Sequence, residues 1–166
     1  LYIGAACLFW MIYISQRYAG NHYHLKEWGF RRDSFKPAFL FILPFATVAI
    51  VGIIWHGLAF HPAMLNWRLL PVLILYPAWG LIQQFMMIGL IAGNLQKMTT
   101  LNLKEPHIIL MVSILFALIH YPSPALMAFA FVMELLFTTA YLKWKNLWPL
   151  GLYHGWISTL FLFLVL

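Results

Sequence analysis

The chain of 166 residues is 64% hydrophobic and only 8% charged, and its mean hydropathy is +0.85. These values exclude an ordinary soluble domain and indicate an integral membrane protein. Five of the ten basic residues crowd residues 16–37, so the formal net charge of +6 indicates contact with anionic lipid rather than with nucleic acid.

The apolar runs predict one bundle of about six transmembrane helices. A helical run of about 20 residues crosses a hydrocarbon core of ~30 Å, and only helices would satisfy the backbone here, because strand-like alternation is absent from the sequence. Proline stands at or near the start of every run but the first, where its missing N–H costs no hydrogen bond. The predicted fold is an all-α polytopic membrane bundle forming a single integral membrane domain, residues 1–166. Its helices are expected at about residues 1–15, 38–60, 71–93, 107–120, 124–142 and 148–166.

The distribution of lysine and arginine predicts the orientation. Nine of these residues lie in the loops 16–37, 94–106 and 143–147, whereas the loops of the opposite side hold only Arg68. By the positive-inside rule, the three basic loops face the cytoplasm, and we expect a prokaryotic cytoplasmic-type membrane. Because the first residue is Leu1 rather than Met, we also expect residues upstream of it to be missing.

Three short segments place polar residues inside predicted helices. One begins at Gln83 with the letters QQFMMI, one ends at His120 with FALIH, and one runs from His154 to Ser158 with HGWIS. In this order they resemble the motifs of the CPBP intramembrane proteases, the family of CAAX prenyl-proteases and of bacteriocin-processing or self-immunity (Abi) proteins. The resemblance covers about residues 70–164 and implies a CPBP-like core.

The chain departs from the pattern of that family at four positions. The family pattern is Glu-Glu-x-x-x-Arg, then Phe-x-x-x-His, then His-x-x-x-Asn. Here Gln83 and Gln84 replace the two glutamates, Ile88 replaces the arginine, and Ser158 replaces the asparagine. A glutamine amide accepts no proton at physiological pH, and loss of a general base costs roughly two to four decades in rate. The resemblance therefore implies a pseudoprotease.

The resemblance also implies a role for each motif residue. Gln83 stands at the position of the catalytic base and His120 at that of its partner, while His154 and Ser158 stand at the oxyanion positions. His154 and Ser158 are four residues apart, so they share one helix face. At 1.5 Å per residue, however, His154 lies ~9 Å and His120 ~20 Å above the cytoplasmic edge, although the family site brings them together.

Glu134 is an acid well inside a predicted helix. An ionisable residue there is costly and is a hypothesis of function by default. It could pair with a buried histidine, contact a partner subunit or remain a neutral hydrogen-bonded acid. It could also supply the carboxylate that the motif lacks, although it lies on another helix.

The sequence predicts no cofactor. His120 and His154 are candidates for a metal, and helical histidines could also ligate a haem or chlorophyll-type pigment, whereas the simpler interpretation is hydrogen bonding between helices. Cys7, in an apolar run, is expected to pack. The remaining histidines lie in the basic loop or near helix ends: His22, His24, His56, His61 and His107.

These observations predict a catalytically degenerate CPBP-type membrane protein that acts as a scaffold, accessory subunit or binding protein in a larger membrane assembly. The alternative is a divergent, active intramembrane protease of the metal or glutamate type that uses His120 and His154. A second alternative is a carrier or binding protein for a lipid or small molecule. The expected partners are membrane lipids and a protein of the membrane complex, with no nucleic acid.

Overall fold

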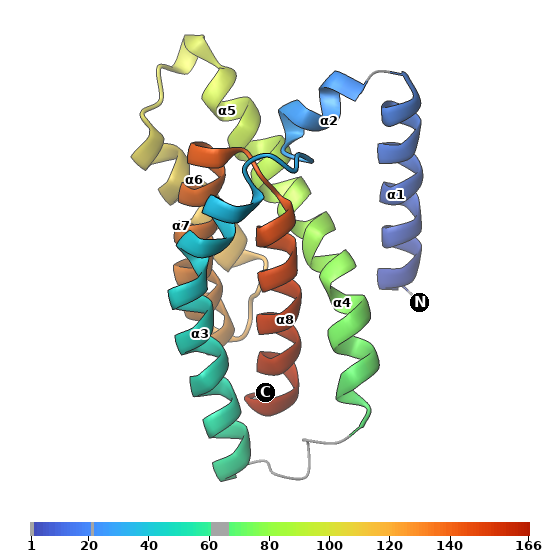
Figure 1. Cartoon of the computed structure of the whole chain (residues 1–166). Helices are drawn as coiled ribbons and strands as arrows, with labels where there is room; N and C mark the ends of the chain where they lie inside the picture. The colour runs from blue at the N-terminus through green and yellow to red at the C-terminus, as the bar shows by residue number, and fades with distance from the viewer. Residues whose placement is uncertain (1, 21, 61–66) are drawn as a thin grey trace.

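The computed structural model describes residues 2–20, 22–60 and 67–166, and every regular element in these ranges is a helix. The predicted all-α fold is thereby confirmed. Helix α8 lies between α3 and α4, α6 packs on α7, and α1 stands at the edge of the bundle beyond α4 (Figure 1). The helices are α1 (Tyr2–Gly20), α2 (His22–Trp28), α3 (Phe35–Phe60), α4 (Leu69–Gln84), η2 (Phe85–Ala92), α5 (Gly93–Lys97), η3 (Thr99–Leu101), α6 (Glu105–Leu118), α7 (Pro124–Trp144) and α8 (Trp148–Leu164).

Three of the predicted spans are long and apolar enough to cross a membrane. They are α3, the continuous stretch Leu69–Lys97 that comprises α4, η2 and α5, and α7. Helix α6 is apolar but has only 14 residues, or about 21 Å at 1.5 Å per residue. That α1, α6 and α8 also cross the membrane stays a prediction.

The stretch 16–37, predicted as a loop, is largely helical. The end of α1, all of α2 and the start of α3 lie within it. Aromatic contacts account for α2: the Trp28 ring stacks on Tyr13 at 6.4 Å and lies 5.3 Å from the ring of Phe85. Packing of this kind outweighs the polar composition from which the loop was inferred.

Helices α4 and α8 approach each other closely enough for backbone to contact backbone. A Cβ atom placed on Gly80 would lie 2.6 Å from the carbonyl oxygen of Gly151, and one placed on Gly155 would lie 2.4 Å from the Cα of Pro77. Gly151 and Gly155 are one turn apart on α8, which is the small-xxx-small spacing of closely packed membrane helices. This contact holds the second half of α4 against the first half of α8, in antiparallel order.

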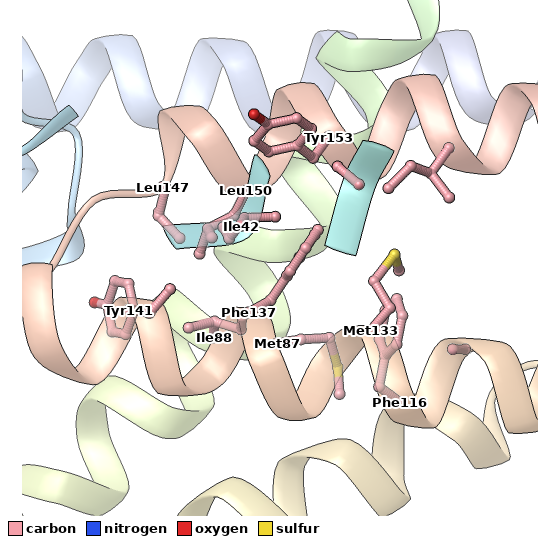
Figure 2. Close-up of a cluster of buried hydrophobic side chains, with 14 of the residues drawn as sticks. Ile42, Met87, Ile88, Phe116, Met133, Phe137, Tyr141, Leu147, Leu150 and Tyr153 are labelled. Carbon is pink, nitrogen blue, oxygen red and sulfur yellow. The ribbon is translucent and has the colours of Figure 1, made fainter. Parts of the chain in front are cut away.

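The hydrophobic core lies where α7, α8 and η2 meet. Phe137 of α7 and Ile88 of η2 are fully buried and lie beside each other (Figure 2). Phe116, which is also fully buried, projects from α6 toward Met133 of α7 in the same view. The side chains of this core surround the polar residues described next.

Candidate polar site between α4, α7 and α8

The site begins at the last turn of α4, where the two motif glutamines face different ways. Successive residues of a helix point about 100° apart, so only one of two neighbours faces the interior. Gln84 is completely buried, whereas Gln83 is half-buried. Directly after Gln84 the helix widens into the π-helix η2, a rare form that is frequent at functional sites.

Gln84 joins three helices through one amide nitrogen. Its Nε2 donates to Glu134 Oε2 of α7 over 3.1 Å and lies 3.0 Å from His154 Nδ1 of α8. An amide nitrogen carries two protons and accepts none, so His154 Nδ1 is the acceptor and the ring proton of His154 sits on Nε2. Glu134 is fully buried and His154 is 2% exposed, so this network is shielded from the surroundings.

Phe116 connects this network to the second motif histidine. The Phe116 ring makes edge contacts with the ring of His154 at 5.5 Å and with the ring of His120 at 4.8 Å. His120 lies in the turn after α6, and its Nδ1 donates to the Phe116 carbonyl oxygen over 2.7 Å. In a neutral ring, its Nε2 would then carry the lone pair. The two histidines flank one phenyl ring, although helix counting placed them at different depths.

Several buried oxygens of the site lack a protein partner. Within the described ranges, Gln84 Oε1, Glu134 Oε1 and Thr138 Oγ1 accept or donate no hydrogen bond. Glu134 and Thr138 lie one turn apart on α7, so they occupy one face of that helix. An unsatisfied buried polar group costs about 1–3 kcal/mol. The site is therefore suited to hold a polar group between α4 and α7.

Comparison with known proteins identifies the family. The family model of the type II CAAX prenyl endopeptidases, Rce1-like, matches residues 65–160, more than half of the chain. The chain belongs to this family. No curated protein and no solved structure matches it.

The structure brings together some of the residues that the sequence resemblance singled out and leaves others apart. Gln84, His154 and, through Phe116, His120 form one group. Gln83 and Ser158 are half-buried, and in the part of the chain that the structure describes neither is hydrogen-bonded to a motif histidine. The pairing of Gln83 with His120 that the resemblance implies therefore stays a prediction.

Two further residues that the sequence singled out also have defined places. Ile88 is fully buried in η2 among apolar side chains. Glu134 reaches the site from α7, outside all three motifs. The sequence singled out Glu134 as an intramembrane acid, but it contained no signal that would pair it with Gln84, since 50 residues separate them.

The other candidate histidines lie outside the site. His56 Nδ1 of α3 lies 3.1 Å from the Leu164 carbonyl oxygen of α8, which is the interhelical hydrogen bond expected of a histidine in a membrane helix. His107 is exposed at the start of α6. Among the side chains that the structure describes, no three of His, Cys, Asp or Glu form a metal-binding group. His61 and the side chains of His22 and His24 lie outside the described residues.

Proposed function

We propose that this chain is a catalytically degenerate member of the Rce1-like family that acts by binding, as a scaffold, accessory subunit or binding protein in a membrane assembly. The observation that supports this most strongly is the hydrogen bonding of Gln84. Both protons of its amide nitrogen are donated, one to Glu134 and one to His154. An amide in this state offers no proton acceptor through its nitrogen, which supports the proposal that Gln84 does not activate water.

The same site favours one alternative, an active but divergent protease. Glu134 brings a carboxyl group into the buried network, and its Oε1 has no protein partner among the described residues. His120 Nδ1 bonds the Phe116 carbonyl oxygen, so a neutral His120 ring would offer its Nε2 as a proton acceptor. In this alternative Glu134 takes over the part of the missing motif acid, with His120 and His154 beside it.

A second alternative is a lipid or small-molecule carrier, and an apolar groove favours it. The groove lies between the η2–α5 segment and α6, has a volume of about 340 Å³ and is lined by Ile91, Leu95, Met111, Val112 and neighbouring leucine and isoleucine residues. Its lining carries no charge, so it suits an acyl chain rather than a polar cargo. The lipids of the surrounding membrane carry acyl chains of this kind and could therefore fill the groove.

The proposed orientation follows the positive-inside rule. Residues 16–37, 94–106 and 143–147 would face the cytoplasm, in a prokaryotic cytoplasmic-type membrane. These segments meet at one end of the bundle, near α2, α5 and the turn between α7 and α8 (Figure 1). A protein partner would then bind the single membrane domain of this chain through the exposed apolar faces of its helices within the membrane.

The test is to restore the motif acids without creating a clash of carboxylates. Gln84→Glu alone would place a second carboxyl group against Glu134, so it is combined with Glu134→Gln, whose amide can donate to the new carboxylate. Together with Gln83→Glu, this triple variant is expected to cleave a prenylated CAAX peptide at least tenfold above the wild type, because a general base contributes about 10²–10⁴ in rate. Product release is measured by mass spectrometry.

Two matched variants decide the outcome of that assay. Adding His154→Ala to the triple variant is expected to abolish its cleavage. Adding Ile88→Arg to the triple variant tests whether the motif cation is needed. Because Ile88 is fully buried, this change could disturb folding, so the triple variant is also assayed without it. Cleavage by the wild type that disappears in His154→Ala would overturn the proposal in favour of the divergent protease.

A further inference from the structure

A second pocket, separate from the Gln84 network, lies at the end of the bundle where α2, α5 and the α7–α8 turn meet. Its volume is about 150 Å³, which is too small for a drug-sized ligand but large enough for one compact polar group. Lys26, Arg31, Lys97 and Lys145 line it, with Glu27 as the one carboxylate of the lining. The lining holds four cations and one acid, and Asp33 beside the lining forms an ion pair with Arg31, so the pocket keeps an excess of positive charge.

The walls of this basic pocket are fixed by hydrogen bonds between distant segments. The Leu147 N–H donates to the Gly29 carbonyl oxygen over 2.9 Å, and Asn146 Nδ2 donates to the Arg31 carbonyl oxygen over 2.7 Å. Gly29 has φ +101°, a conformation that side chains rarely adopt, and it turns the chain at this point. The cationic side chains therefore stand on a preformed frame, so binding needs little reorganisation.

The cations of the basic pocket are only partly neutralised. Lys97 Nζ lies 3.6 Å from Glu27, whereas Lys145 Nζ lies 4.6 Å above the Tyr141 ring and donates to the amide oxygen of Gln96. Within the described part of the chain, no carboxylate forms an ion pair with Lys145. Burial, and then the nearby charge of Lys97, lower the pKa of Lys145 to about 8, whereas Glu105 on α6 acts in the opposite direction. An anion between these lysines would relieve that repulsion.

We propose that the basic pocket binds a phosphate group. Lysine ammonium groups are suited to phosphate as point charges, and three of them, Lys26, Lys97 and Lys145, line the pocket. Arg31 contributes less, because its Nε and one of its terminal nitrogens already bond Asp33. The phosphate could belong to the headgroup of an anionic lipid or to a soluble phosphate compound. The inference does not depend on the chemistry of the Gln84 network, because the two sites share no residue.

The experiment measures the thermal unfolding midpoint of the full chain in dodecyl maltoside micelles, which contain no phosphate. Phosphatidylglycerol is compared with diacylglycerol of the same chains, and inorganic phosphate is compared with sodium chloride of matched ionic strength. Binding to the folded state raises the midpoint by mass action. We expect a rise of several degrees with phosphatidylglycerol, with inorganic phosphate or with both, and none with either comparator.

Variants locate the response. Lys97→Gln with Lys145→Gln is expected to lose at least half of the rise. The control pair Lys36→Gln with Lys104→Gln removes the same charge from exposed positions outside the pocket and should keep the rise. Lys97→Arg with Lys145→Arg should keep the rise too, because both positive charges remain. A loss confined to the glutamine pair would then follow from the missing charge rather than from any change at these two positions.

Each outcome bears on the proposal. A rise only with phosphatidylglycerol assigns the pocket to a lipid headgroup, and a rise only with inorganic phosphate assigns it to a soluble compound. The proposal is overturned if phosphatidylglycerol and diacylglycerol act alike and phosphate acts like chloride. It is equally overturned if the pocket variants and the control variants respond to the same extent.

Discussion

Gly155→Ala is expected to lower the free energy of unfolding by about 3 kcal/mol, at the upper end of the range for overpacking. The new Cβ would lie 2.4 Å from the Cα and 2.5 Å from the nitrogen of Pro77. These are backbone atoms, so no rotamer change relieves the clash, and α4 must move away from α8. The measurement is the midpoint of detergent-induced or thermal unfolding, followed by helical circular dichroism.

Gly52→Ala is the matched control for that change. Gly52 lies on α3, and nothing comes within 4 Å of a Cβ placed on it. Alanine is favoured over glycine in a helix by about 1 kcal/mol, so this variant should be at least as stable as the wild type. If both variants unfold at the wild-type midpoint, α4 and α8 do not approach each other as closely at Gly155 as described.

Gln84→Leu is expected to cost about 3 kcal/mol, because it leaves two buried polar groups without their shared donor. Glu134 Oε2 and His154 Nδ1 would both lose their partner, while leucine fills nearly the same volume as glutamine. The unfolding midpoint of the purified variant measures the loss. The same change should alter the NMR signal of the His154 ring nitrogens.

The neighbouring glutamine provides the control. Gln83 is half-buried and has no hydrogen bond to the motif histidines in the described part of the chain, so Gln83→Leu should change stability by less than about 1 kcal/mol. A larger loss for Gln83→Leu than for Gln84→Leu would mean that Gln83 faces the site. The family-based assignment of the base position to Gln83 would then hold geometrically.

The helices were predictable because they follow long apolar runs that begin at proline. The run expected at 124–142 is α7, Pro124–Trp144, and the run expected at 38–60 is α3, Phe35–Phe60. Helix α2 was missed because its residues are polar and aromatic and its order comes from packing against Tyr13 and Phe85. Tertiary contacts of this kind leave no periodic signal in a short segment.

The residues of the candidate site were predictable, but their pairing was not. The motifs named Gln84, His120 and His154, whereas the choice between Gln83 and Gln84 depends on the rotation of α4 and on the π-helix that follows it. The bond between Gln84 and Glu134 connects two helices that are distant in sequence. His120 lies in the turn after α6 and is linked to His154 through the Phe116 ring, an arrangement that counting along regular helices does not predict.

The most direct test of a non-catalytic function is gentle purification from the native membrane, with mass spectrometry of what accompanies the chain. We expect a second protein in stoichiometric amount, because a family member that has glutamine in place of both motif glutamates is expected to act through binding. The complex should persist in a mild detergent and survive His154→Ala. A chain that purifies alone, with no protein in stoichiometric amount, would contradict the account.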